Sequence, residues 1–243
     1  MKPSNGRTLA ILFGSAAVLE ALRYTVLASA SFWWRFIPAH FVEGPCNTLA
    51  TGGINCAGSV AAYGLLVPVL LLVRLPRDRW GLSFRRGDVK VLWLALLLVG
   101  AVLVGPAAMA APSVRLYYPV FRYAGHHPAL FAGWQGLQLA MLLGTEFFYR
   151  GPLLFSLADK LGRWPAAAVM VFPYMLSHVG STPAEILASI PAGLLLGWLA
   201  LRTGSILPGF ALHACAAISV DVSSLVLRGQ LGFLGIDAVF PAP

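Results

Sequence analysis

Residues 142–155 of the chain read LLGTEFFYRGPLLF and place one acid and one base inside a long apolar run. The run extends from 129 to 158, which is long enough for a helix to cross a bilayer. Glu146 and Arg150 lie four residues apart, so on a helix they share one face in the order that favours an ion pair. Charged side chains inside a membrane usually face the bundle interior or a wet cavity. The stretch therefore predicts either a functional polar site or a buried pair that only locks two helices together.

Composition indicates a membrane protein. The chain has 243 residues, of which 58% are hydrophobic and only 11% are charged, and its mean hydropathy is +0.78. Soluble domains are about one-quarter charged. We therefore expect an all-α, polytopic membrane bundle that forms one integral-membrane domain over residues 1–243, with the lipid bilayer around it. The net charge of +8 does not indicate a nucleic-acid partner, because the basic residues fall mostly in short loops between apolar runs.

Apolar runs along the chain predict about seven transmembrane helices. The predicted helices span 8–30, 57–73, 89–111, 129–158, 164–178, 183–201 and 206–227.

The distribution of Lys and Arg predicts the orientation of these helices. With the N-terminus in the cytoplasm, the inner segments carry eleven basic residues and the outer segments carry four. The same orientation places Cys46 and Cys56 in an outer loop, where they could form a disulfide in an oxidising compartment. We therefore predict a cytoplasmic N-terminus.

Titratable residues on four of the predicted helices lie at similar depth. At about 1.5 Å of rise per residue, Glu146, His178 and His213 lie roughly 16–21 Å from the inner ends of their helices. Glu185 lies slightly further out, at roughly 24 Å. An isolated intramembrane histidine is usually a packing residue, but groups gathered at one level predict a shared polar site.

Such a site has the parts for hydrolysis. A carboxylate and an imidazole can hold and deprotonate a water, and a second imidazole can donate to a developing oxyanion. A serine mechanism is less favoured, because Ser177 points about 100° away from His178 on a helix. The sequence has no HExxH motif, although His178, His213 and one Glu could in principle bind zinc. We expect peptide-bond hydrolysis without a cofactor or a metal ion.

Three motifs in order resemble those of the CAAX-protease and bacteriocin-processing (CPBP, or Abi) family of glutamic-type intramembrane proteases. They are TEFFYRG at 145–151, YMLSH at 174–178 and GWLALRTGSILPGFALH at 197–213. The resemblance covers about 129–227, which it marks as the catalytic core, and leaves 1–111 as accessory N-terminal helices.

The resemblance implies a role for each matching residue. Glu146 and His178 would activate the water, and His213 would stabilise the oxyanion of the transition state. Arg150 would orient Glu146. The substrate would be a membrane protein or a membrane-associated peptide.

The chain departs from the family motifs at three positions. Thr145 stands where the family usually has a first Glu, Ala217 where it usually has Asn or Asp, and Tyr174 where it usually has Phe. Glu185 and Asp221 could replace the missing groups, and Glu185 is therefore a second candidate for the catalytic acid. This pattern is similar to bacterial members, such as myxosortases, that are proposed to process C-terminal sorting tails. The resemblance thus implies a bacterial inner membrane.

Two other functions are compatible with the sequence. An inactive relative that binds a transmembrane partner would explain Thr145 and Ala217. A small transporter or proton relay would use the same acids and histidines, although the sequence has no inverted repeat of the transporter kind.

Overall fold

The structure is a computed structural model that describes residues 6–22, 69–70, 75–82, 90–121, 124–179 and 181–230. These residues form helices and connecting turns without a strand, which confirms the all-helical class for this part of the chain. The predicted second helix lies outside the described residues except for 69–70, as do Cys46 and Cys56. The elements are α1 (Gly6–Leu22), η3 (Arg77–Arg79), α4 (Lys90–Val102), α5 (Val104–Ala108), α6 (Pro112–Tyr117), α7 (Pro128–Phe148), η4 (Tyr149–Leu153), α8 (Leu154–Leu161), α9 (Arg163–Leu176), α10 (Pro183–Thr203) and α11 (Leu207–Leu227).

Two of these helices, α10 and α11, are long and apolar enough to cross a membrane. The other described helices do not meet both conditions, so the described residues do not confirm the predicted count of seven.

The predicted continuous helix over 129–158 is wrong. The chain forms α7, then the wider turn η4, then α8, with a non-helical backbone at Gly151 (φ −86°, ψ −106°). Pro152 explains the break, because a proline lacks an N–H and its ring clashes with the carbonyl four residues back, which is that of Phe148. Glu146 thus lies at the end of α7 and Arg150 in the turn that follows it.

The predicted helix over 89–111 is also divided. It forms α4 and α5, and α4 ends at Val102, four residues before Pro106. At Gly105 the backbone of α5 lies close to α11, where its amide donates to Ser219 Oγ at 3.0 Å.

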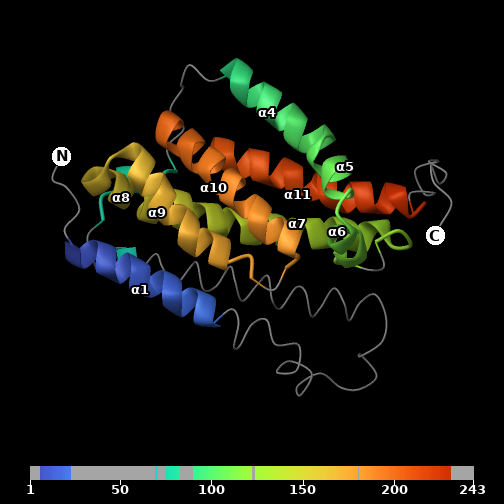
Figure 1. Cartoon of the computed structure of the whole chain (residues 1–243), viewed down its shortest axis with the longest axis horizontal. Helices are drawn as coiled ribbons and strands as arrows, with labels where there is room; N and C mark the ends of the chain where they lie inside the picture. Colours follow the sequence, from blue (N-terminus) through green and yellow to red (C-terminus); the bar gives the residue numbers. More distant parts are fainter. Residues whose placement is uncertain are drawn as a thin grey trace.

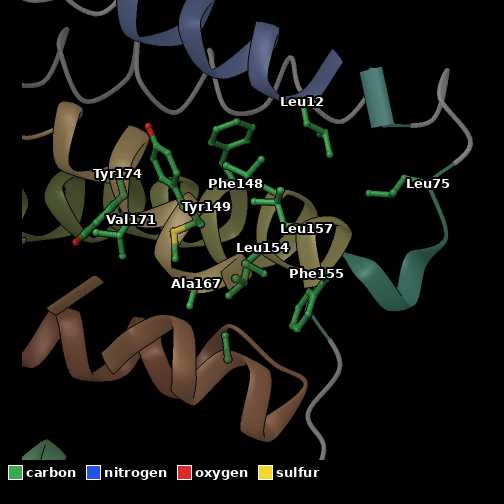
Figure 2. Close-up of a cluster of buried hydrophobic side chains, with 14 of the residues drawn as sticks. Leu12, Leu75, Phe148, Tyr149, Leu154, Phe155, Leu157, Ala167, Val171 and Tyr174 are labelled. Atoms are coloured by element: carbon green, nitrogen blue, oxygen red, sulfur yellow. The ribbon is translucent and has the colours of Figure 1, made fainter. Parts of the chain in front are cut away.

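The remaining helices lie around a central group formed by α7, α9, α10 and α11 (Figure 1). Figure 1 places α4 on one side of this group, against α11, and α1 on the opposite side, where it contacts α9 and η4. The largest buried apolar cluster joins α1, η4, α8, α9 and α10, and Figure 2 shows its side chains converging between these elements. The break after α7 is therefore packed on several sides rather than exposed.

One end of the molecule is closed by contacts between short connections. Gly81 accepts a hydrogen bond from the Ile206 amide at 2.8 Å, and Arg79 forms an ion pair with Asp159. A side chain at Gly151 would lie 2.6 Å from the carbonyl oxygen of Trp80, so only glycine fits where this connection crosses η4. The segment at 75–82 therefore holds the break that carries Arg150.

Candidate active site

Glu146 is the centre of a buried polar cluster. Its side chain is 0% exposed, and its Oε1 lies 2.8 Å from His213 Nδ1 and 3.1 Å from an Arg150 guanidinium nitrogen. The three residues come from α7, α11 and η4. The structure thus brings two chain segments more than sixty residues apart onto a single carboxylate oxygen.

The second oxygen of the carboxylate is in a different situation. Oε2 is buried and has no hydrogen-bond partner among the described residues. It faces the backbone of Gly209, where an added Cβ would lie 3.6 Å from it. Because an unbonded carboxylate oxygen retains its capacity to accept a hydrogen bond, Oε2 is the oxygen of Glu146 that remains available to a further donor.

Tyr174 on α9 connects Arg150 to both histidines. The Arg150 guanidinium carbon lies 3.7 Å from the centre of the Tyr174 ring. The ring meets His178 edge-on at 4.7 Å and His213 edge-on at 6.5 Å, measured between ring centroids. Glu146, Arg150, Tyr174, His178 and His213 together form what we call the Glu146 cluster.

His178 is oriented by the carbonyl of the residue one turn earlier. Its Nδ1 lies 3.1 Å from the carbonyl oxygen of Tyr174. With the proton on Nδ1, the ring donates to this carbonyl and carries its basic lone pair on Nε2. The structure therefore places His178 in the cluster through Tyr174, whereas His213 contacts Glu146 directly.

Ser177 lies closer to His178 than helix geometry predicts. Its Oγ is 3.3 Å from His178 Nδ1, but it also donates to the Tyr174 carbonyl at 2.6 Å. The turn at the end of α9 accounts for the difference, because Ser177 is the residue that caps this helix. The hydroxyl proton is directed to the backbone rather than to the imidazole.

Glu185 is bonded outside the Glu146 cluster, at the start of α10. Its Oε2 accepts from the backbone amide and the hydroxyl of Thr182, while the Glu185 amide donates back to the Thr182 hydroxyl. This is a capping box. Its Oε1 accepts from the hydroxyl of Tyr118, which lies after α6. We call Tyr118, Thr182 and Glu185 the Glu185 cluster.

Tyr118 remains a donor over a wide pH range. Burial raises the pKa of the Tyr118 phenol well above its usual value, and the neighbouring Glu185 carboxylate raises it further. The backbone carbonyl of Tyr118 accepts from Arg228 at 3.0 Å. The segment after α6 is therefore attached to the start of α10 and to the end of α11.

Asp221 lies on α11 and is 0% exposed. Its Oδ2 accepts from the Gln135 side chain on α7 at 2.7 Å, and Oδ1 has no hydrogen-bond partner among the described residues. The sequence around Gln135 does not predict that its side chain donates to Asp221. It is joined to Asp221 by the packing of α7 on α11.

Two of the three departures from the motifs, Thr145 and Ala217, lie near the cluster in the chain, and the third, Tyr174, belongs to it. Thr145 directs its hydroxyl to the Met141 carbonyl one turn back at 3.0 Å. Ala217 follows His213 by one turn of α11 and adds no polar side-chain atom. Within the described part of the chain, no group of three or more His, Cys, Asp or Glu is arranged to hold a metal ion.

Comparison with known protein families gives a match to the part of the chain that contains Glu146, His178 and His213. Residues 126–219 match the family described as "Type II CAAX prenyl endopeptidase Rce1-like". The comparisons with curated proteins and with solved structures gave no significant match.

Proposed function

We propose that the chain is an intramembrane endopeptidase. The premise is that it belongs, through residues 126–219, to the Rce1-like CAAX endopeptidase (CPBP) family. This is a family of proteases that act in the membrane on membrane proteins. The family match and the two long apolar helices together indicate an integral membrane protein. The finer proposal is that Glu146 and the two histidines activate water and cleave a peptide bond near a C-terminal membrane tail.

The observation that carries this proposal is the asymmetry of the Glu146 carboxylate. Oε1 is held by His213 and Arg150, which fixes the plane of the group, while Oε2 makes no hydrogen bond within the described residues. A general base needs a fixed orientation and a lone pair within reach of the proton it removes. Glu146 has both features.

The proposed reaction uses water as the nucleophile. Glu146 Oε2 takes one proton from the water, and His178 Nε2 accepts a hydrogen bond from its other O–H. The resulting oxygen attacks the carbonyl carbon of the peptide bond, whose electrons move onto its oxygen. An imidazolium at His213 donates from Nδ1 to Glu146 and from Nε2 to this oxyanion. The tetrahedral intermediate then collapses, and the proton on Glu146 passes to the leaving amine.

Arg150 has a positioning role in this proposal. Its charge balances that of Glu146 in a fully buried site, where an unpaired carboxylate would be costly. The pair also explains why the break after α7 matters, since η4 sets the position of Arg150 relative to Glu146.

We further propose that the end carrying 75–82 faces the cytoplasm. The segments assigned to the inner side by their basic residues meet there through Arg79 and Asp159, and Gly6 lies near Lys160. An Asp78→Cys variant in a background without Cys46, Cys56 and Cys215 should react with an impermeant maleimide only after the cells are opened. Labelling in intact cells would show that residues 75–82 face the outside, which is the opposite orientation.

The function is tested with purified protein and two probes. One is a prenylated peptide ending in a CAAX sequence, and the other is a peptide with a hydrophobic C-terminal tail. We expect the parent to cleave at least one of them and Glu146→Ala to cleave neither. A folded parent that cleaves neither probe, yet binds the tail peptide, would support the inactive binding protein instead.

A further inference from the structure

Arg150 carries a buried charge with few partners. Its side chain is 0% exposed, and none of its three guanidinium nitrogens makes a hydrogen bond of regular geometry to a described residue. Its contacts are the ion pair with Glu146 and the face of the Tyr174 ring at 3.7 Å. Since a buried guanidinium needs compensation beyond one anion, the negative face of the ring has a measurable electrostatic role.

The same ring contacts both histidines of the Glu146 cluster. His178 and His213 approach it edge-on, with interplanar angles of 73° and 80°. Edge-to-face contacts restrict how far an imidazole can turn. A shift of the Tyr174 ring would therefore change the base, the oxyanion donor and the orienting cation together.

A glycine on α10 fixes the ring from one side. A Cβ added at Gly193 would lie 2.9 Å from Tyr174 Cδ1 and 3.2 Å from Cε1. Tyr174 also belongs to the buried cluster of Figure 2, where it packs edge-on against Tyr149 at 5.5 Å between centroids. The ring has little room to move without displacing α10.

We infer that Tyr174 is a positioning residue of the reaction, acting through the electrostatics of its ring face on Arg150 and through edge-to-face contacts with His178 and His213. The inference rests on the proposed function for its catalytic meaning. The role is assigned to the ring, which lies against the guanidinium, so Tyr174→Phe should retain it.

The first test separates ring electrostatics from ring shape. Position 174 is replaced by Phe and then by 4-fluoro-, 3,5-difluoro- and 3,4,5-trifluorophenylalanine, which weaken the negative face at nearly constant size. Tyr174→Phe should keep kcat within about twofold, and kcat should then fall stepwise to about tenfold below Phe, with KM unchanged. The same series at Phe121, which stacks on Trp134 at 6.3 Å, is the control and should leave kcat constant.

The second test moves the ring without touching a charged residue. Gly193→Ala should lower kcat about tenfold, because the new methyl group must displace the Tyr174 ring. Gly136→Ala on α7 is the matched control, since no heavy atom lies within 4 Å of its added Cβ, and it should leave kcat unchanged. A Gly193→Ala variant with parental kcat would contradict the inference.

The third test does not depend on activity. The ¹⁹F resonance of 4-fluorophenylalanine at position 174 is recorded in detergent-solubilised protein. It should shift in Arg150→Met and remain in place in Arg115→Met, which removes an exposed charge. A shift in a protein that cleaves neither probe would support the placement of Tyr174 while removing the proposed function. The inference would be overturned if the ¹⁹F chemical shift did not change in Arg150→Met and kcat stayed constant across the fluorinated variants.

Discussion

Two carboxylates in this molecule, Glu146 and Glu185, have contrasting hydrogen-bond environments. Both oxygens of Glu185 accept hydrogen bonds, from Tyr118 on one side and from Thr182 on the other. Glu146 is held at one oxygen only, and its Oε2 accepts nothing from the described residues. A carboxylate whose oxygens are all occupied stabilises structure, whereas one fixed at a single oxygen can act as a base.

The comparison teaches how to separate a structural acid from a reactive one. Depth in the membrane does not separate them, since both acids were expected at nearly the same level. The partners do. Glu185 is bonded to a helix cap and to a connecting segment, while Glu146 is bonded to an imidazole and a guanidinium. Asp221 is intermediate, since it has one oxygen without a bond and a Gln rather than a His as its partner.

The largest expected effect concerns the charge pair of the Glu146 cluster. Glu146→Gln should lower kcat by about 10²–10⁴ because the general base is lost. It should also destabilise the protein by about 3–5 kcal/mol, because Arg150 keeps a buried charge without its anion. The double variant Glu146→Gln/Arg150→Met should recover most of the thermal stability in detergent and none of the cleavage. Recovery of cleavage in the double variant would mean that Glu146 acts only through stability.

The next effect concerns the histidines. His213→Ala should lower kcat by about 10²–10³, the value of one oxyanion donor. His178→Ala should also abolish measurable cleavage, because the water loses a partner that orients it. Both are checked by initial rates on the cleaved probe, after gel filtration confirms that the variants are folded. Parental rates in either variant would remove that histidine from the mechanism.

A smaller effect is expected in the Glu185 cluster. Tyr118→Phe removes a hydrogen bond to a carboxylate and should cost about 1.5–3 kcal/mol of stability. Thr182→Ala removes the cap and should cost about 1 kcal/mol. The unfolding temperature in detergent measures both, and kcat should stay within about threefold of the parent. A loss of cleavage without a loss of stability would show that the Glu185 cluster takes part in the reaction.

The smallest effect is expected at Asp221. Asp221→Asn keeps an acceptor for Gln135 and should change stability by less than about 1 kcal/mol. Cleavage rates should match those of the parent, because no residue of the Glu146 cluster bonds to Asp221 in the described structure. An inactive but folded Asp221→Asn would show that this acid replaces a missing family residue.

Much of the fold followed from hydrophobic runs, because a helix that crosses a membrane must be long and apolar. The ends of α10 and α11 agree with the predicted spans to within about two residues, which is the usual uncertainty of helix ends. The two predicted helices that are divided in the structure share a sequence feature. In each, a Gly precedes a Pro, at Gly105–Pro106 and at Gly151–Pro152.

Proline alone was not the signal. Pro173 lies within α9 and Pro191 within α10, and neither divides its helix. Both follow a residue with a side chain. Pro152 follows Gly151, where glycine tolerates the non-helical backbone of the break, and Pro106 follows Gly105, which lies inside α5 and packs closely against α11. In the described residues a Gly–Pro pair therefore accompanies each divided helix, whereas the prolines within α9 and α10 do not divide theirs.

The Glu185 cap could also have been predicted. Thr182 and Glu185 have the spacing of a capping box, directly before an apolar run. The bond from Tyr118 could not, because it joins residues 67 apart in sequence and depends on how α6 packs on α10. The shared level of Glu146 and His213 was predicted, but their direct contact depends on the packing of α7 on α11.

The central claim is that Glu146, and not Glu185, is the base. The most direct measurement compares Glu146→Gln with Glu185→Gln, which make the same chemical change at the two carboxylates, in one cleavage assay and one thermal unfolding assay. We predict that Glu146→Gln loses at least about 10² in kcat, while Glu185→Gln keeps kcat within about threefold and unfolds at a lower temperature. An inactive, stable Glu185→Gln beside an active Glu146→Gln would contradict the account.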